Sequence, residues 1–352
     1  MKKTDRNSWI VFPILILVGA LVAYAGSQGG STYNGIPVFA LCVALAFVIQ
    51  WIVFIPSYLK QTEKFFDLTG SLTYISVVTI GLLLSGSFDA RVILLWALVV
   101  IWAVRLGTFL FGRIRKAGKD DRFDELKPSF IRFLNVWTIQ ALWVTFTFAA
   151  ALVAITTLTR KGLDAFAVVG FLIWVFGFAF EVIADSQKSR FAADPANKGK
   201  FIQSGLWSKS RHPNYFGEIV LWIGVAFIAL PVLTGLQWVA LISPLFVALL
   251  LTPLQVAGEA QRQHLQRVVG DLEGHVRRIA LGEMSLARRV LFAIELPRRF
   301  PDEQAHGVDL HRHLREHERN GLLLRDLHAE GFAFFCVLLC IFKRRSCYAD
   351  SG

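Results

Sequence analysis

Polar side chains that could bind an anion gather in one short segment directly before an apolar run. The segment SKSRHPNYFGEIVLWIG, residues 208–224, contains Arg211, His212, Pro213, Asn214, Tyr215 and Glu218. Proline suits the first turn of a helix, where its missing N–H is not needed, so we expect a helix to begin here. The free N–H groups and partial positive charge of a helix N-terminus, together with Arg211 and His212, favour a diphosphate or a carboxylate as ligand.

The remaining side chains of this segment could serve recognition or proton transfer. Asn214 and Glu218 lie one turn apart, so they would offer a hydrogen-bond donor and an acceptor on one side of the helix. Tyr215 would supply a flat face or a phenolic proton. Each residue also has a structural interpretation, in which His212 caps the helix, Tyr215 is an interfacial aromatic residue and Glu218 is a partner of the helix dipole.

A second polar surface precedes this segment in the sequence. Glu181 and Asp185 are four residues apart, and Lys188 follows one turn later, so a helix would place all three on one face. This face could hold a ribose or a phosphate, or it could be an ion-paired helix end. Arg105 lies inside an apolar run, where a charge is costly, and we expect it to pair with Glu181 or to contact a ligand.

A third group of charges follows Arg105. The stretch RLGTFLFGRIRKAGKDDRFDELK, residues 105–127, carries Arg113 and Lys116 and then the carboxylates Asp120, Asp121 and Asp124. These residues lie beyond the apolar run. Taken by themselves, they predict an ordinary solvated loop at the membrane edge.

The elements that must position these residues are membrane-spanning helices. Hydrophobic residues make up 55% of the 352 residues, a larger share than a soluble domain normally carries. Apolar runs of this length without strict alternation favour helices over barrel strands. The sequence therefore predicts an all-α, polytopic transmembrane helical bundle with about eight spans. The expected spans are residues 9–25, 37–56, 72–88, 90–111, 136–156, 165–184, 215–233 and 238–256.

Basic residues predict the orientation of the bundle. With the N-terminus inside, the inner segments 2–6, 60–64, 113–132 and 188–211 hold 18 Lys and Arg, and the outer loops hold Arg91, Arg160 and Lys161. Positive charge is retained on the cytoplasmic side. We therefore expect a multi-pass protein of the bacterial inner membrane with a cytoplasmic N-terminus, and we read the first apolar run as a retained helix.

Several function classes find no support in the sequence. The formal charge of +11 is explained by positive-inside bias and contact with anionic membrane lipids, so no nucleic-acid partner is expected. The four cysteines have no CxxC spacing, and no metal site or disulfide framework is predicted. Neither a GxGxxG motif nor a GxxxxGK[ST] motif occurs, which argues against a soluble-type dinucleotide or P-loop domain.

The polar motifs carry a family resemblance. Together with FDLTGSLTYI at 66–75 and ADSQKSRFAADPANKGKF, the segments quoted above resemble the bacterial DUF1295 membrane proteins over roughly residues 37–252. That group is similar to the C-terminal domain of steroid 5-alpha-reductases, in a superfamily with sterol C14-reductases and isoprenylcysteine carboxyl methyltransferases. The resemblance implies a cytosol-facing cofactor pocket, which binds NADPH in the reductases and S-adenosylmethionine in the methyltransferases.

The resemblance also implies roles for individual residues. Asn214 and Tyr215 correspond to contacts with the nicotinamide end of the cofactor. The ribose and phosphate contacts implied are Asp185, Lys188, Arg190, Arg211 and His212, with Arg113 and Lys116 in the basic loop. The implied reaction is hydride transfer from NADPH to a carbon–carbon double bond of a lipid or steroid-like enone, a lipophilic small molecule, assisted by a general acid.

The general acid is the least defined part of this reaction. Trp102 stands about where the steroid enzymes have a tyrosine, and their Tyr/Glu pair has no direct match. The candidate catalytic residues are Tyr215, Glu218, Glu181, Asp67 and Tyr74. Two alternatives remain open: an S-adenosylmethionine-dependent membrane methyltransferase, and a non-catalytic transporter or scaffold. The substrate skeleton and the oligomeric state are not predicted.

The composition changes after residue 256. Residues 258–352 contain one Lys but 14 Arg, and they hold seven of the eight His. The sequence therefore divides into a transmembrane reductase-like domain, 1–256, and an atypical Arg/His-rich cytosolic tail, 257–352, which a frameshifted reading of a GC-rich gene would also produce. In the tail, His313 and His317 have a metal-compatible spacing without a third ligand. The apolar run 331–342 is too short for an ordinary span.

Overall fold

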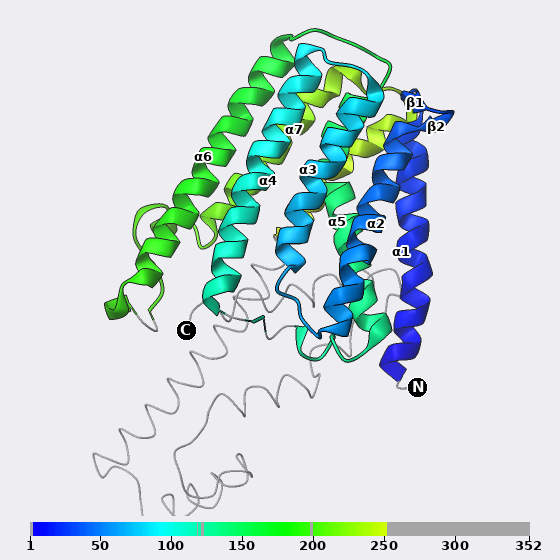
Figure 1. The fold of residues 1–352 in the computed structure, drawn as a ribbon. Coiled ribbons are helices and arrows are strands. Elements are labelled where there is room, and N and C mark those ends of the chain that lie inside the picture. Colours follow the sequence, from blue (N-terminus) through cyan, green and yellow to red (C-terminus); the bar gives the residue numbers. More distant parts are fainter. Residues whose placement is uncertain (1–2, 118, 121–122, 198–199, 252–352) are drawn as a thin grey trace, which may run out of the picture. The chain divides into compact units, whose positions relative to one another are not determined.

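A computed structural model describes residues 3–117, 119–120, 123–197 and 200–251, and Figure 1 shows their fold. The long helices are α1 (Lys3–Ser27), α2 (Val38–Leu59), α3 (Phe66–Ser85), α4 (Ala90–Ala117), α5 (Phe130–Thr156), α6 (Ala165–Ala193) and α7 (Pro213–Ala229). The short elements are the strands β1 (Thr32–Tyr33) and β2 (Ile36–Pro37) and the 3-10 helices η2 (Pro195–Asn197), η3 (Gly205–Ser208), η4 (Leu230–Val232) and η5 (Gly235–Leu241). The predicted tail, with His313, His317 and the run 331–342, lies outside the described residues.

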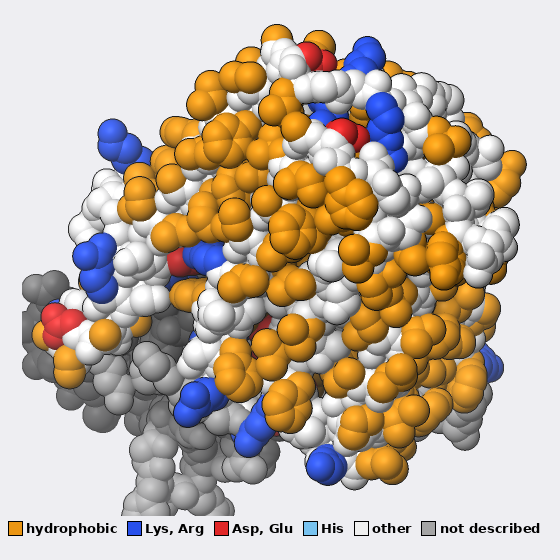
Figure 2. Space-filling model, turned by 45° about the horizontal axis from the view of Figure 1, so that its top comes forward, with side chains coloured by type: hydrophobic (Ala, Val, Ile, Leu, Met, Phe, Trp, Pro, Cys, Tyr) orange, Lys and Arg blue, Asp and Glu red, His pale blue; other side chains and the backbone are white. Residues whose placement is uncertain are grey.

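The expected all-α transmembrane bundle is confirmed. Within the described ranges, seven helices are long and apolar enough to cross a membrane. The eighth expected span is represented by a shorter apolar helical segment, Gly235–Leu251, whose first part is η5. Pro231 lies in η4, directly after α7. Hydrophobic side chains cover much of the face seen in Figure 2, as contact with lipid requires.

Successive helices run in opposite directions, and α5 lies at the centre of the bundle (Figure 1). Helices α1, α2, α3, α4 and α7 all pack against α5, whereas α6 packs mainly against α7. This alternation brings the N-terminus and the α2–α3, α4–α5 and α6–α7 connections to one end of the bundle. We call this the basic end, because the 18 Lys and Arg counted above belong to these segments.

The opposite end is held together by a buried arginine, Arg91, near the start of α4. Its guanidinium donates to the backbone oxygens of Lys161 (3.2 Å) and Gly162 (2.8 Å) in the α5–α6 loop, and to Ile228 in the last turn of α7. It also pairs with Asp164 at 2.8 Å, and Asp164 caps α6 by accepting from the Ala167 N–H. One side chain thus fastens α4, α6 and α7 at the end away from the basic loops.

Helices α6 and α7 approach each other through glycines. A Cβ atom added at Gly177 would lie 2.5 Å from the Leu221 nitrogen, and one at Gly217 would lie 2.6 Å from the Glu181 nitrogen. Gly170 and Gly224 meet in the same way further along the pair. Small residues let helix backbones come this close in membranes. The close approach carries the polar first turns of α7 against the polar last turns of α6.

Candidate functional site

The site is built around Arg105, in the middle of α4. Its guanidinium forms ion pairs with both Glu181 and Asp185, which lie one turn apart on α6. Glu181 is 2% exposed and Asp185 is 7% exposed. The expected pairing of Arg105 with Glu181 is therefore present, and Asp185 is a second partner. Because a buried charge is stable only when paired, each of the three residues depends on the others.

The start of α7 brings a further amide and a further carboxyl group to this cluster. The helix begins at Pro213, as predicted, with no side-chain cap from His212. The Asn214 side chain lies beside the Asp185 carboxylate. Glu218, one turn later, interacts electrostatically with Glu181 and Arg105. We call Arg105, Glu181, Asp185, Asn214 and Glu218 the polar cluster.

Two acceptor oxygens of the polar cluster are buried without a protein partner. Oε2 of Glu181 and Oδ1 of Asn214 have no hydrogen bond to any part of the chain that the structure describes. A buried acceptor left unpaired costs about 1–3 kcal/mol. Such atoms are therefore expected to receive donors from a ligand or from water.

Basic side chains of α6 and of the α6–α7 connection lie at the basic end. The Lys188 ammonium lies 5.5 Å from the centre of the Trp207 ring. Trp207 is in η3, and its indole N–H donates to the Ala184 oxygen at 3.0 Å, which holds η3 against α6. Arg190 and Arg211 are exposed at the same end. His212, which precedes α7, stacks on Tyr215 with 5.0 Å between ring centres.

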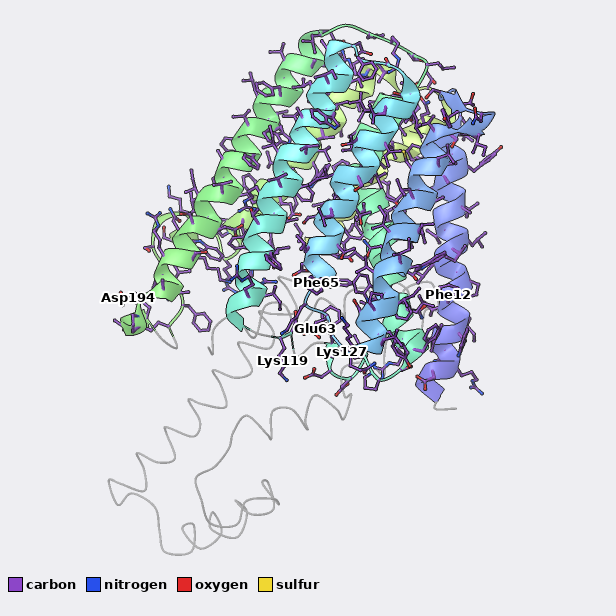
Figure 3. All side chains as sticks on the ribbon, viewed as in Figure 1. Phe12, Glu63, Phe65, Lys119, Lys127 and Asp194 are labelled. Carbon is purple, nitrogen blue, oxygen red and sulfur yellow. The ribbon has the colours of Figure 1, made fainter. Side chains whose placement is uncertain are left out.

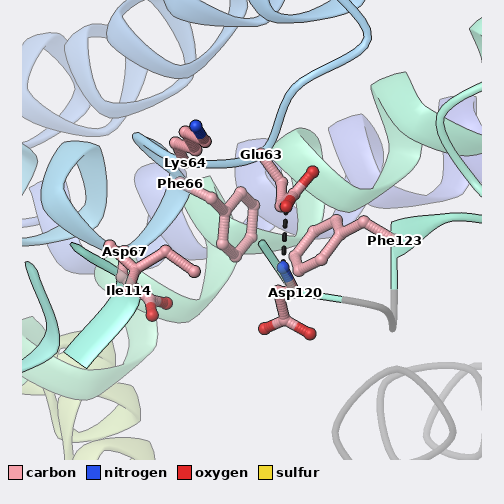
Figure 4. A pocket seen from close by; sticks show the side chains of 7 residues that line it. All are labelled: Glu63, Lys64, Phe66, Asp67, Ile114, Asp120 and Phe123. Carbon is pink, nitrogen blue, oxygen red and sulfur yellow. Dashed lines mark hydrogen bonds between the residues drawn. The ribbon is translucent and has the colours of Figure 1, made fainter. Parts of the chain in front are cut away.

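The two cofactor contacts predicted on α4 are Arg113 and Lys116. Arg113 pairs with Asp67 on α3 at 3.3 Å. Asp67, a candidate acid, lies at the basic end of α3 and lines a pocket there (Figure 4). The Lys116 side chain lies outside the described residues. An anion binding at Arg113 would compete with the Asp67 carboxylate.

Tyr74, a candidate acid on α3, lies deeper in the bundle. Its ring packs edge-to-face against Trp102 of α4 (5.1 Å between centres) and Phe148 of α5 (5.6 Å). Glu218 is close enough to interact electrostatically with its hydroxyl. Tyr74 and Asp67 are seven residues apart on one helical face, which separates them by about 10 Å along the axis. Of these two α3 candidates, Tyr74 is therefore the one beside the polar cluster.

Comparison with known proteins agrees with the motifs on these helices. The model of the family "Protein of unknown function (DUF1295)" matches residues 53–268, more than half of the chain. The chain belongs to the DUF1295 family. No curated protein and no solved structure matches it. The DUF1295 match contains Asp67, Tyr74, the polar cluster and the basic residues around it.

The described part of the α4–α5 connection of this DUF1295 protein carries solvent-exposed charges, as expected, at Lys119 and Asp124. It is also anchored by Glu63, a buried residue of the α2–α3 turn. Glu63 accepts a hydrogen bond from the Asp120 N–H at 2.8 Å (Figure 4) and pairs with Lys127 at 2.6 Å. Figure 3 labels Glu63 and Lys127 among the side chains of this end of the bundle. Lys127 also pairs with Asp124 (3.0 Å). No local pattern singled out Glu63, because its partners Asp120 and Lys127 are more than fifty residues away in the sequence.

Proposed function

We propose that this protein is a membrane-embedded oxidoreductase that uses NADPH to reduce a carbon–carbon double bond of a lipid or steroid-like enone. The single observation that carries the proposal is the pair of unpaired buried acceptors, Glu181 Oε2 and Asn214 Oδ1, within the described part of the chain. A nicotinamide nucleotide offers matching donors in its ribose hydroxyls and its carboxamide.

The charges around these acceptors support a phosphorylated ligand. Lys188 and Arg190 lie in the last turns of α6 at the basic end, and Arg211 lies two residues before the start of α7. Guanidinium and ammonium groups bind phosphates through charge-assisted hydrogen bonds, and free N–H groups at a helix N-terminus add to this attraction. Arg113 would join them by exchanging Asp67 for a phosphate oxygen.

The residues of the chain would then have distinct roles in the reaction. When bound, NADPH supplies a hydride to the β-carbon of the enone and leaves as NADP⁺. The two electrons pass to the conjugated system, so negative charge develops on the substrate's carbonyl oxygen, and a proton must be added at the α-carbon. Tyr74 and Glu218 are the candidate proton donors, and Arg105 holds Glu181 and Asp185 in place.

One observation favours a second candidate function, methyl transfer from S-adenosylmethionine. Three carboxyl groups act on the single guanidinium of Arg105: Glu181 and Asp185 pair with it, and Glu218 interacts with it electrostatically. An excess of acidic groups suits the sulfonium and ammonium charges of that cofactor. The basic residues Lys188, Arg190 and Arg211 favour NADPH instead, because S-adenosylmethionine has no phosphate.

We further propose that the basic end faces the cytoplasm of a bacterial cell. The concentration of Lys and Arg at this end supports the orientation. NADPH does not cross membranes. Inside-out membrane vesicles should therefore consume added NADPH in the presence of an enone, whereas sealed right-side-out vesicles should do so only after permeabilisation.

The first experiment measures thermal stabilisation of the purified, detergent-solubilised protein by NADPH, NADH and S-adenosylmethionine. A ligand at 100 times its dissociation constant should add about 2.7 kcal/mol of stability. We expect the largest shift with NADPH and a smaller one with NADH, which lacks the 2′-phosphate. Asn214→Ala should lose most of the NADPH shift.

Asn135→Ala is the matched control, because it removes a buried amide from α5 that bonds to the Ser8 oxygen instead. It should lower the melting temperature and keep the shift. A shift with S-adenosylmethionine alone would replace the reductase with a methyltransferase. Stabilisation by none of the three would contradict both enzymatic functions.

A further inference from the structure

Three aromatic side chains with polar hydrogens meet in the interior of the bundle. Tyr74 of α3 packs against Trp102 of α4, and Trp102 packs against Trp222 of α7 with 4.9 Å between ring centres. Both contacts are edge-to-face. The three side chains are 4%, 1% and 0% exposed, respectively. We call them the donor cluster.

None of the three polar groups is paired within the described ranges of the chain. The Tyr74 hydroxyl and the indole nitrogens of Trp102 and Trp222 are buried and have no hydrogen-bond partner there. Thr147 lies next to Tyr74, but no hydrogen bond of ordinary geometry joins their hydroxyls. An indole N–H can only donate, so each tryptophan lacks an acceptor. Native proteins leave few buried polar groups unpaired, and three in contact with one another are unusual.

The donor cluster lies about one helical turn further from the basic end than the polar cluster. Trp102 precedes Arg105 by three residues on α4, which runs toward the basic end. Trp222 follows Glu218 by four residues on α7, which runs away from that end. Both tryptophans are therefore about 5 Å deeper in the membrane than their polar neighbours. Three donors from three helices thus form a layer next to the two unpaired acceptors, Glu181 Oε2 and Asn214 Oδ1.

We propose that the donor cluster binds the carbonyl oxygen of an apolar ligand, such as an enone or a quinone. A carbonyl oxygen has two lone pairs and no hydrogen of its own, so it matches a site that is rich in donors. The aromatic walls exclude water, which makes each hydrogen bond stronger.

This inference rests on the proposed function for its chemical purpose. Addition of a hydride to the β-carbon of an enone moves negative charge onto the carbonyl oxygen. Donors already placed at that oxygen stabilise the charge as it develops. Trp102 and Trp222 would then be substrate-positioning residues as well as packing residues. Ligand binding at the donor cluster can be measured without any turnover.

The test uses (E)-3-dodecen-2-one labelled with ¹³C at its carbonyl, added to the full-length protein in detergent and followed by infrared difference spectroscopy. Hydrogen bonding should move the carbonyl stretch of the bound probe to lower wavenumber than in empty micelles. Trp102→Phe and Trp222→Phe should each reverse part of this movement and weaken probe binding about fivefold, the loss expected for one hydrogen bond. 1-Dodecene, which lacks the oxygen, should not compete.

Trp137→Phe is the matched control. Trp137 is also fully buried, and its indole nitrogen has no partner in the described part of the chain, but it packs among Phe66, Phe133 and Val136. This variant should lose a similar amount of stability and keep the carbonyl shift. An unchanged carbonyl stretch in both Trp102→Phe and Trp222→Phe, or an equal change in Trp137→Phe, would overturn the proposal.

A second measurement covers variants that do not fold. In unmodified protein labelled with ¹⁵N at its indole nitrogens, the enone should move two N–H resonances downfield and 1-dodecene should move none. Failure to move any resonance would overturn the donor cluster as a site. Carbonyl binding without stabilisation by NADPH would overturn the reductase and leave the donor cluster standing. Stabilisation by NADPH without a carbonyl shift would support the reductase and overturn the donor cluster as a carbonyl-binding site.

Discussion

Arg105 is the residue on which the arrangement of the polar cluster depends. It lies within a membrane-spanning helix, and both of its partners, Glu181 and Asp185, come from α6. Taking a charge out of water is costly, and the attraction between the three groups offsets that cost only while all are present. The ion pairs therefore fix the position of α6 relative to α4, and with it the acceptor oxygen of Glu181.

Replacing Arg105 alone should lower the unfolding free energy more than neutralising Arg105, Glu181 and Asp185 together. Arg105→Ala leaves two carboxylates without a partner, so we expect a loss of about 3 kcal/mol in unfolding free energy. The triple variant Arg105→Met, Glu181→Gln, Asp185→Asn leaves no unpaired charge and should recover much of that loss. Thermal unfolding in detergent measures both. A triple variant as unstable as the single one would contradict this account.

Helix pairing between α6 and α7 decides which polar groups can meet. The glycines at the crossing allow backbone contact, and Gly217 lies between Asn214 and Glu218 on α7. A side chain at the crossing would push the helices apart, because the nearest atoms are backbone atoms that cannot rotate away. A larger separation of α6 and α7 would weaken the contact between Asn214 and Asp185.

Gly177→Ala should therefore lower both stability and ligand binding, even though alanine favours helix formation. Gly112→Ala in α4 is the matched control, since a Cβ there would meet nothing within 4 Å. By helix propensity alone the control should gain up to about 1 kcal/mol. Melting temperature and the shift caused by NADPH are the measurements. If both variants were equally stable, close packing of α6 and α7 would not be required.

Ion pairs occur at both ends of the helical bundle, but only those at the basic end lie beside residues proposed to bind the cofactor. At the basic end, ion pairs such as Lys127–Glu63 order the loops beside the proposed cofactor site. At the other end, Arg91 and Asp164 fasten the helices without any residue proposed for binding. Burial raises the pKa of Asp164, but hydrogen bonds from Arg91 and from the Ala167 N–H outweigh it and hold the pKa below its ordinary value of 3.8.

Stability should therefore depend on pH at both extremes. The contribution of ionised Asp164 is complete above pH 3.8 and is lost as pH falls through the lower folded-state pKa. Burial lowers the pKa of Lys127, but Glu63 and Asp124 outweigh it and raise the pKa above 10.5, so its contribution is lost only as pH rises beyond that value. Melting temperature against pH measures both losses. Asp164→Asn should reduce the acidic loss and leave the alkaline loss unchanged, and an unaltered acidic loss would refute this assignment.

Much of this organisation could be predicted from composition and spacing. Long apolar runs indicated the spans, Pro213 marked the start of α7, and the four-residue spacing of Glu181 and Asp185 placed them on one face. The cost of a lone charge in lipid indicated that Arg105 either pairs with Glu181 or contacts a ligand, and the structure shows the pairing. These features depend on local sequence or on a general property of the membrane.

The contacts between distant residues could be read only from the packed helices. Hydropathy and charge act residue by residue, so the amino-acid sequence was sufficient to predict a helical membrane protein with one basic end. Glu63 with Lys127, Arg91 with Asp164, and Tyr74 with Trp102 and Trp222 come from separate helices or loops. Their contacts depend on how the helices pack, and helix packing depends on side chains far apart in the chain.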